Sequence, residues 1–403
     1  MRKILSLSAA AAISAAILAT GLPAHAADRP AVAVAPAAQQ DAAARAQAVI
    51  DKGLEFLKTQ QQPDGAWHNQ MMPPAISAIV LRALVQDGKY STKDPFIKKG
   101  YDKLLSHQLD SGGIYKDMLA NYNTAIAVSA LAAAEDPSFK DEIDKAVAYL
   151  KDLQWTDEIA TTKDGKTIPI NADNPWYGGA GYGKHGRPDG SNTQLMIEAL
   201  HDAGLPKDDP AFKAALKFVS RMQNLSETND QPWAGNDGGA VYTPANNGES
   251  FAGEYTGPDG KRMLRSYGSM TYAMLKSYIY AGLTKEDPRV KAAWDWIRKN
   301  WTLEENPGMR ANDPANAQHG LYYYYLTLAR ALHAYGQPVI EDPQGNKHDW
   351  RVEFINKMAS LQKPDGSWVG DKKWMEDNAS LATAFTIIAL QEAQKDLQQR
   401  PAK

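Results

Sequence analysis

The motif Gln-x-x-Asp-Gly-x-Trp occurs near both ends of the chain, as QQPDGAW at residues 61–67 and QKPDGSW at residues 362–368. Four fixed positions that recur so far apart in one chain indicate an internal repeat. Asp-Gly is a turn signal, because glycine adopts a positive φ at no steric cost. We predict that the motif staples helical hairpins. The Gln amide would reach backbone groups at the start of a neighbouring inner helix, and the Trp would pack on the Gln and the loop beneath it.

The same repeat recurs between these two copies. Gln108, Gln154 and Gln223 align with the motif glutamine, and Trp301 takes its place in a fifth copy. In each copy, a charged segment with apolar residues three and four positions apart precedes a glycine-bearing loop and a second helical segment. The second segments are richer in Ala, Leu, Met and Tyr, and cover roughly residues 74–86, 121–134, 191–203, 266–281, 318–334 and 378–393.

This alternation predicts the fold. A helix that is apolar on most sides is buried on most sides, so we expect the second segments inside and the charged first segments outside. A single hairpin cannot bury its own apolar face, whereas a ring of hairpins leaves no exposed end. The sequence therefore predicts an all-α, single-domain α/α6 toroid, a closed barrel of six outer and six inner helices.

The N-terminal stretch reads as a secretory signal peptide. Arg2 and Lys3 precede an apolar, alanine-rich run that ends at the small-residue cleavage sequence Ala24-His25-Ala26. The run is too short for a membrane anchor, and no later segment approaches a membrane-spanning length. We therefore expect a secreted or periplasmic protein. The expected divisions are a signal peptide at 1–26, an Ala/Pro-rich tether at 27–44, the toroid at 45–397 and a tail at 398–403.

Composition narrows the function classes. The sequence has no cysteine, which excludes disulfides, thiolate metal ligands and a cysteine nucleophile. With 44 basic and 47 acidic residues and no basic cluster, we expect no nucleic-acid partner. No two histidines stand at ligand spacing on one helix, and there is no phosphate-binding loop or dinucleotide fingerprint. The sequence predicts neither a metal site nor a cofactor, and it leaves the oligomeric state open.

The stretch KGLEFLKTQQQPDGAW at residues 52–67 resembles the QW motif of squalene–hopene cyclases. GSNTQLMIEAL at 190–200 and YGSMTYAMLKSYIYAGL at 267–283 are similar to inner helices of the broader prenyltransferase/squalene oxidase-repeat family, whose members share the α6/α6 toroid. The resemblance implies this fold over nearly all of the chain after the leader. The sequence lacks the Asp-x-Asp-Asp string of protonating cyclases and, without cysteine, the zinc ligands of protein prenyltransferases. Those two chemistries are therefore not expected.

Three long loops indicate where a site would lie. They cover roughly residues 156–190, 225–264 and 302–317, and each joins an outer helix to its inner partner, so all three emerge at one end of the barrel. The inner-helix N-termini, with their partial positive charge, lie at the same mouth. We expect a polar mouth above an apolar, Tyr-lined lumen. The candidate catalytic residues are Asp189, Asp377, His185 and His319, and the candidate substrate-binding residues are Arg187, Arg265, Tyr182, Asn192, Tyr322 and Tyr323.

These candidates have possible roles at the mouth. Arg187 or Arg265 would hold an anionic group of the ligand, and Asp189 or Asp377 would donate or accept a proton. For Asp and Asn at helix starts, N-capping is the commoner role. A glycine-rich loop also commonly carries solvated charges, and a Tyr stripe at helical spacing is more often core than a ligand site.

Three functions fit these features. The first is a protein that binds an elongated apolar or isoprenoid-like ligand in the lumen and, if it is an enzyme, transforms it as a terpenoid-cyclase-like or transferase-like enzyme. The second is a carbohydrate-active enzyme, a polysaccharide lyase or hydrolase, whose glycan would fit an aromatic, Asn-rich cleft. The third is a non-catalytic repeat scaffold. A closed apolar lumen would favour the first, an open groove lined by Trp and paired carboxylates the second, and a filled lumen the third.

Overall fold

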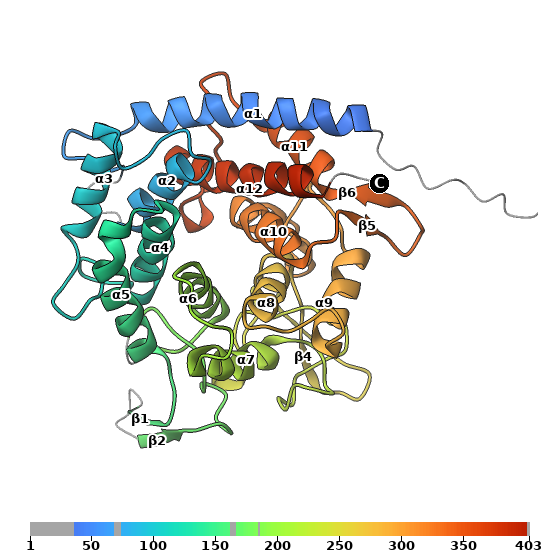
Figure 1. Cartoon of the computed structure of the whole chain (residues 1–403). Helices are drawn as coiled ribbons and strands as arrows, with labels where there is room; N and C mark the ends of the chain where they lie inside the picture. The colour runs from blue at the N-terminus through green and yellow to red at the C-terminus, as the bar shows by residue number, and fades with distance from the viewer. Residues whose placement is uncertain (1–35, 68–73, 162–166, 184–185, 401–403) are drawn as a thin grey trace, which may run out of the picture. The chain divides into compact units, whose positions relative to one another are not determined.

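The computed structural model describes residues 36–67, 74–161, 167–183 and 186–400. Within these residues, twelve α-helices alternate between an outer and an inner position (Figure 1). The outer helices are α1 (Pro36–Thr59), α3 (Pro95–Leu105), α5 (Lys140–Leu153), α7 (Pro210–Met222), α9 (Pro288–Lys299) and α11 (Trp350–Leu361). The inner helices are α2 (Ala75–Val85), α4 (Ala120–Ala133), α6 (Gly190–Asp202), α8 (Gly268–Tyr280), α10 (Leu321–Tyr335) and α12 (Ala379–Gln399).

Asp-Pro pairs begin several outer helices. Asp209 accepts a hydrogen bond from the backbone N–H of Ala211 at the start of α7, and Asp287 accepts one from Arg289 at the start of α9. The proline after each aspartate occupies the first turn, where a backbone N–H would have no partner within the helix. The sequence thus fixes where these outer helices start.

The repeated glutamines join consecutive outer helices. Gln61 Nε2 donates to the carbonyl of Phe96 in α3, 2.8 Å away, and Gln362 Nε2 donates to the carbonyl of Val49 in α1, 2.9 Å away. The expectation that this amide reaches an inner helix is therefore wrong. Because Gln362 bonds to α1, the sixth copy packs against the first. The same outer-helix bond runs from Gln108 to Glu142, from Gln154 to Ala211 and from Gln223 to Arg289.

The motif tryptophans link the outer helices to the inner ones. The backbone N–H of Trp368 donates to Thr383 Oγ1 of α12 at 3.0 Å, and its indole N–H donates to the carbonyl of Met358 in α11 at 3.0 Å. Trp67 makes the equivalent two bonds in the first copy. Both indoles are buried, which agrees with the predicted stapling role.

The inner helices pack side by side in chain order, and α12 also packs against α2. One bond at this last junction runs from Gln391 Nε2 of α12 to the carbonyl of Ala83 in α2, over 2.9 Å. The apolar side chains of the inner helices and the inward faces of the outer helices form one contiguous core. This arrangement is a mostly helical toroid, as the repeat pattern predicts.

Two helix ends differ from the prediction. Helix α1 begins at Pro36, so residues 36–44 belong to the first outer helix rather than to a tether, and Ala42 is buried there. The alanines of this stretch are strong helix formers. Helix α12 also extends to Gln399, beyond the expected end of the toroid at 397. The predicted signal peptide lies outside the described residues.

Short strands add to the predicted all-α fold. They form three antiparallel hairpins among the described residues, two in the long loops before α6 and α8 and one between α10 and α11. The pairs are β1 (Glu158–Thr161) with β2 (Thr167–Ile170), β3 (Glu254–Thr256) with β4 (Arg262–Leu264), and β5 (Val339–Glu341) with β6 (Lys347–Asp349).

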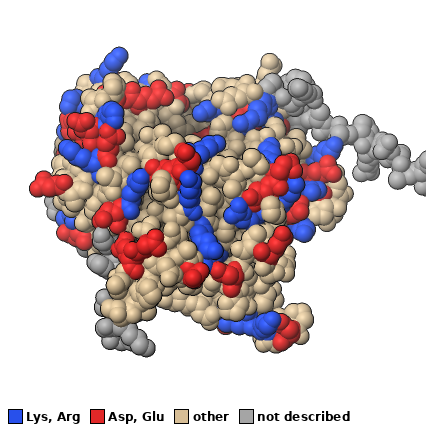
Figure 2. All heavy atoms as spheres, turned by 60° about the horizontal axis from the view of Figure 1, so that its bottom comes forward, with Lys and Arg blue, Asp and Glu red and all other residues tan. Residues whose placement is uncertain are grey.

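The surface carries both signs of charge. On the face drawn in Figure 2, basic and acidic side chains lie next to one another over much of the area. The described surface also has exposed pairs one helical turn apart, such as Lys98 with Asp102, and such pairs contribute little to stability. In the described part of the chain, none of the helices combines the length and the apolar character needed to cross a membrane.

Candidate functional site

Asp189 caps helix α6 at the mouth where the inner helices begin. Its carboxylate accepts hydrogen bonds from the backbone and side-chain N–H groups of Asn192, both over 2.9 Å, and a further one from Tyr242. Burial raises the pKa of Asp189 to about 6, although these hydrogen bonds and the charge of Arg187 oppose the rise. The structure therefore brings the predicted residues Asp189 and Asn192 together, but as an N-cap pair.

Tyr242 connects two further predicted residues to this cap. Arg187 lies over the Tyr242 ring, with its Cζ 5.9 Å from the ring centroid, and forms an ion pair with Glu249. Tyr182 is partly exposed, and its side chain forms a hydrogen bond with Tyr242. The sequence did not single out Tyr242, because one tyrosine in a long loop gives no pattern.

The remaining polar candidates of the long loops have separate partners. The Cζ of Arg265 lies 4.8 Å from the centroid of the Tyr255 ring, beside the β3–β4 hairpin. His319 Nε2 lies 3.8 Å from Asp371 Oδ1. His185 falls outside the described residues. Neither Arg265 nor His319 makes a direct hydrogen bond, ion pair or ring contact with Asp189 in the described structure.

Glu376, rather than Asp377, is the buried carboxylate before α12. Asp377 is exposed, whereas Glu376 is 1% exposed and its Oε1 accepts a hydrogen bond from the backbone N–H of Tyr323 at 2.7 Å. Burial raises the pKa of Glu376 to about 7, although backbone N–H groups in the first turn of α10 oppose the rise. The structure thus buries Glu376, whereas the sequence analysis names Asp377 as a possible proton donor or acceptor at the mouth. Glu376 takes the inward place because it satisfies free N–H groups at the start of α10.

The lumen beneath the mouth is nearly filled by side chains. The Tyr323 hydroxyl accepts a hydrogen bond from Gln194 Nε2 at 3.0 Å, and Tyr322 packs edge-on against Tyr325. The cavity left between the inner helices has a volume of about 20 Å³, which is room for about one water molecule. The expected chamber for an elongated apolar ligand is therefore occupied by the protein's own Tyr, Leu, Ile and Phe side chains, so the lumen by itself favours the scaffold over the isoprenoid-like ligand.

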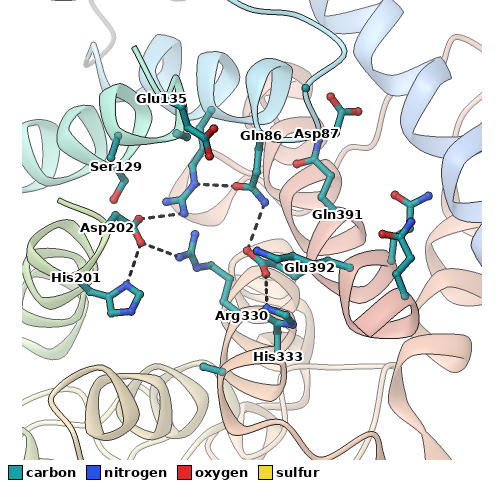
Figure 3. A pocket seen from close by; sticks show the side chains of 18 of the residues that line it. Gln86, Asp87, Ser129, Glu135, His201, Asp202, Arg330, His333, Gln391 and Glu392 are labelled. Atoms are coloured by element: carbon teal, nitrogen blue, oxygen red, sulfur yellow. Dashed lines mark hydrogen bonds and ion pairs between the residues drawn. The ribbon is translucent and has the colours of Figure 1, made fainter. Parts of the chain in front are cut away.

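A cavity of about 1010 Å³ lies at the other end of the barrel, where the inner helices finish. Each inner helix contributes to its wall near its C-terminus, and Figure 3 shows Asp202 and Arg330 pointing toward each other there. The wall includes Arg82 of α2, Ser129 of α4, Asp202 of α6, Tyr280 of α8, Arg330 of α10 and Glu392 of α12.

A buried ion-pair cluster separates this cavity from the lumen. Glu198 of α6 lies 2.7 Å from Arg82 Nη1 and 2.9 Å from Arg330 Nη1, and also pairs with Lys276 of α8. Asp202 lies 3.1 Å from Arg82 Nη2 and 3.5 Å from Arg330 Nη2. Three cations thus surround two carboxylates, and Arg82 and Arg330 line both cavities.

The cluster holds Asp202 and Arg82 in their charged forms. Burial opposes the charge of Asp202, but Arg82 outweighs it, and the pKa of Asp202 lies below its usual value. Burial would likewise lower the pKa of Arg82, but Asp202 and Glu198 hold it above the usual value. The described residues contain no group of three or more His, Asp or Glu side chains suited to a metal ion. The charged side chains of the wall can therefore form hydrogen bonds with a bound molecule.

Two histidines also line the cavity, each beside carboxylates. His201 Nδ1 lies 3.3 Å from Asp202 Oδ1. His333 Nδ1 lies 3.2 Å from Asp396 Oδ2, and its Nε2 lies 3.7 Å from Glu392 Oε2. Imidazole can donate or accept a proton near neutral pH. The cavity therefore offers both hydrogen-bonding and proton-transfer groups.

Sequence reasoning missed this end of the barrel, although a signal was present. Arg82 in AISAIVLRALV, Glu198 in LMIEAL, Lys276 in YAMLKSYIY and Arg330 in LTLARALHAY are charged residues in apolar inner helices. A charge on a buried helix requires a partner. Such charged residues recur near the C-terminal end of several inner helices, which indicates that they are partners of one another.

Comparisons with known proteins support the fold. No family model matches the sequence. A stretch of 186 residues, 43% of this chain, is 26% identical to squalene–hopene cyclase from Alicyclobacillus acidocaldarius. The match spans only about a quarter of that cyclase, 27% of its length.

Two solved structures have a similar fold at low sequence identity. A variant of the type II terpene cyclase MstE from Scytonema, in complex with geranylgeranyl dihydroxybenzoate, aligns with 89% of this chain and 100% of its own, with a TM-score of 0.53 and 13% identity. The cellobiose 2-epimerase from Spirochaeta thermophila aligns with 91% of this chain and 99% of its own, with a TM-score of 0.52 and 13% identity. The chain therefore has a terpenoid cyclase-like helical fold.

Proposed function

We propose that the protein binds a polyhydroxylated, carbohydrate-class ligand in the cavity at the C-terminal ends of the inner helices. The observation that carries the proposal is the size and polarity of this cavity, about 1010 Å³ with Arg82, Asp202, Arg330 and Glu392 in its wall. A volume of this size accommodates a small molecule. Hydroxyl groups both donate and accept hydrogen bonds, so a sugar matches a wall that mixes guanidinium, carboxylate and amide groups.

Two details of the wall favour a sugar over a strongly charged ligand. Glu198 and Asp202 balance two of the three cations of the cluster, and Glu392 adds a further carboxylate to the cavity wall near Arg82, so the wall carries both signs of charge. In the described structure, the buried atoms Arg330 Nε and Gln391 Oε1 have no hydrogen-bond partner. Residues that line the cavity therefore keep at least one donor and one acceptor without a hydrogen bond.

The isoprenoid-like ligand is the weaker candidate for this chain. The apolar lumen offers about 20 Å³, and a hydrocarbon in the larger cavity would desolvate the charged groups of its wall without replacing their hydrogen bonds. MstE was solved with geranylgeranyl dihydroxybenzoate, but the likeness at 13% identity concerns the fold. The cellobiose 2-epimerase has nearly the same likeness, with a TM-score of 0.52, so the fold is compatible with either ligand.

The proposal includes proton transfer as the chemistry that the cavity can supply. His201 beside Asp202 and His333 beside Asp396 are both in the wall. Positioned imidazoles are the commonest general acids and bases. As an enzyme, the protein would be a carbohydrate-active enzyme that works by acid–base catalysis, such as a lyase or hydrolase.

Isothermal titration calorimetry with the purified protein tests the proposal. Cellobiose, maltose and lactose serve as neutral saccharides, and farnesol serves as an apolar isoprenoid. We expect at least one disaccharide to bind and farnesol not to bind. Binding of farnesol alone would favour the isoprenoid reading, and binding of none of the four would favour a scaffold.

We also propose that the ring is closed and that the chain is exported. The bonds from Gln362 to Val49 and from Gln391 to Ala83 support closure, because they join the sixth copy to the first. The charged, apolar and small-residue sections of the N-terminal stretch support export. N-terminal sequencing of secreted or periplasmic material should give a start near Ala27, and an intact Met1 would contradict export.

A further inference from the structure

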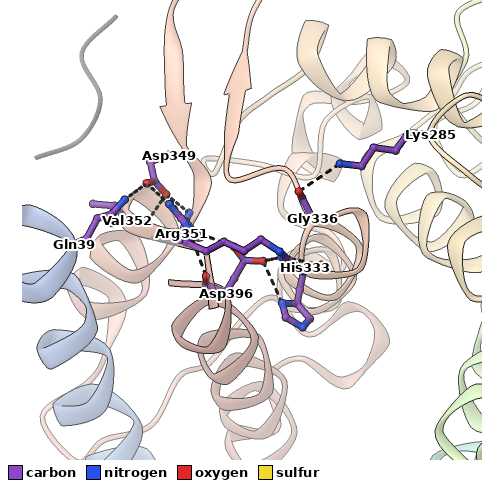
Figure 4. A network of polar contacts seen from close by, with 9 residues as sticks. Gln39, Lys285, His333, Gly336, Asp349, Arg351, Val352 and Asp396 are labelled. Atoms are coloured by element: carbon purple, nitrogen blue, oxygen red, sulfur yellow. Dashed lines mark hydrogen bonds and ion pairs between the residues drawn. The ribbon is translucent and has the colours of Figure 1, made fainter. Parts of the chain in front are cut away.

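The two histidines of the cavity differ in what lies behind them. Asp202, beside His201, is itself part of the cavity wall, whereas Asp396, beside His333, does not line the cavity. The Asp396 side chain is 0% exposed. Figure 4 shows Asp396 between His333 on one side and Arg351 on the other. Of the two histidines, only His333 therefore lies next to a fully buried carboxylate in the described structure.

Asp396 is held in place by two arginines. Arg351 Nη1 lies 3.4 Å from Asp396 Oδ1, and Arg400 forms an ion pair with Asp396 Oδ2. Arg351 is also 0% exposed and makes two bonds to Asp349, over 2.8 and 2.7 Å. Buried charged groups held by several hydrogen bonds have little freedom to rotate. Asp396 therefore presents a fixed oxygen to His333.

This network determines how the His333 ring is oriented. Nδ1 lies 3.2 Å from Asp396 Oδ2, and an ionised carboxylate only accepts, so Nδ1 carries a hydrogen. Nε2 is 3.7 Å from Glu392 Oε2, which is beyond hydrogen-bond distance. Because His333 and Glu392 both line the cavity, a hydroxyl group of a ligand could bond to both.

We propose that His333 contacts the bound ligand through Nε2, and that Asp396 and Arg351 are positioning residues that hold it there. The inference rests on the proposed function, since it takes the ligand to be a saccharide in this cavity. It adds the residue that recognises a hydroxyl group and the groups that orient this residue. The change Asp396→Asn tests the orientation, because the amide N–H₂ can donate to Nδ1 and favour the tautomer with the hydrogen on Nε2.

Long-range ¹H–¹⁵N spectra of the histidine rings, recorded during a titration with the disaccharide that binds, provide the readout. We expect the Nε2 signal of His333 to move on binding while its Nδ1 signal moves little. In Asp396→Asn, we expect the hydrogen to shift from Nδ1 to Nε2. We expect the affinity for the same disaccharide to fall about tenfold, as for the loss of one hydrogen bond.

His348 is the matched control, because it also lies between two carboxylates but outside the cavity lining. Its Nδ1 is 2.9 Å from Glu353 Oε1 and its Nε2 is 3.5 Å from Asp342 Oδ2. His348→Gln should keep the wild-type affinity, whereas His333→Gln should lose about tenfold. His333→Gln also tests the inference if Asp396→Asn fails to fold.

The outcomes separate the inference from the proposed function. Wild-type affinity in His333→Gln, or an unmoved Nε2 signal at saturating disaccharide, would overturn the inference and leave carbohydrate binding standing. A wild-type protein that binds none of the disaccharides would overturn both. A moved Nε2 signal with weakened binding in His333→Gln supports both.

Discussion

Arg82 of α2 donates a hydrogen bond to Glu198 of α6 over 2.7 Å, although α4 packs between these two helices in the ring. The bond therefore crosses the interior of the barrel rather than following its wall. Arg330 of α10 reaches the same carboxylate from another direction. The charged base of the cavity is thus a property of the whole ring, and no single hairpin could form it.

Replacing Glu198 should destabilise the fold strongly. Glu198→Ala leaves Arg82, Lys276 and Arg330 with one fewer carboxylate in a buried site, and loss of one partner of a buried ion pair costs about 3–5 kcal/mol. Lys98→Ala is the control, because Lys98 pairs with Asp102 on the exposed surface, where such pairs contribute about 1 kcal/mol or less. Urea unfolding measures both. Equal, small losses would show that the cluster contributes little.

Glu376 should make stability depend on pH. Since burial raises its pKa from 4.5 to about 7, the folded state binds this proton more tightly than the unfolded state. Its contribution is therefore complete below pH 4.5 and is lost as the pH rises from about 4.5 to 7. Glu376→Gln keeps a neutral acceptor for the N–H of Tyr323, so it should be more stable than wild type at pH 8 by on the order of 2 kcal/mol.

The neighbouring Asp377 provides the control for this measurement, because it is exposed. Asp377→Asn should keep the wild-type dependence of unfolding free energy on pH, measured by urea titration between pH 4 and pH 8. An identical pH dependence in wild type and Glu376→Gln would show that Glu376 is not a buried acid.

Gly366 should be irreplaceable in the stapling motif. Its φ is +92°, and a Cβ there would lie 2.4 Å from the carbonyl oxygen of Lys52 in α1. Gly345 has a similar φ of +82° but nothing within 4 Å of a Cβ. Alanine at either site incurs the left-handed backbone cost of about 1–2 kcal/mol, and Gly366→Ala adds a clash between the sixth and first copies.

Thermal and urea unfolding of the two glycine variants should therefore differ. We expect Gly345→Ala to lower the free energy of unfolding only by the cost of the left-handed backbone. Gly366→Ala should lower it clearly more. Equal losses would mean that the motif loop can move away from α1, and the stapling account would then be wrong.

The helical fold was predictable from the sequence because its repeat is long and periodic. The positions of Gln61 and Gln362, the Asp-Pro starts and the apolar second segments all indicate alternating outer and inner helices. The partner of the glutamine was mispredicted, because a motif gives spacing but not the direction of a side chain. The start of α1 was mispredicted because alanine-rich sequence suits both a linker and a helix.

The candidate site was much less predictable. Long loops pointed to the N-terminal mouth, where the structure places Asp189 and Asn192 as a cap and fills the lumen with tyrosines such as Tyr323. The position of the cavity depends instead on where the C-terminal ends of the inner helices are spaced apart. Packing of the whole ring determines this spacing. The choice between Glu376 and Asp377 depends on the local backbone, and adjacent acidic residues cannot be distinguished by composition.

The most direct test of the account is whether a bulky side chain in the cavity wall abolishes saccharide binding. Ala132 of α4 lines the cavity, and Ala44 of α1 is exposed and does not. Calorimetry of wild type, Ala132→Trp and Ala44→Trp with the disaccharide that binds should show loss of binding in Ala132→Trp alone, with unchanged melting temperatures as the check on folding. Undiminished binding in a folded Ala132→Trp would contradict a ligand site in this cavity.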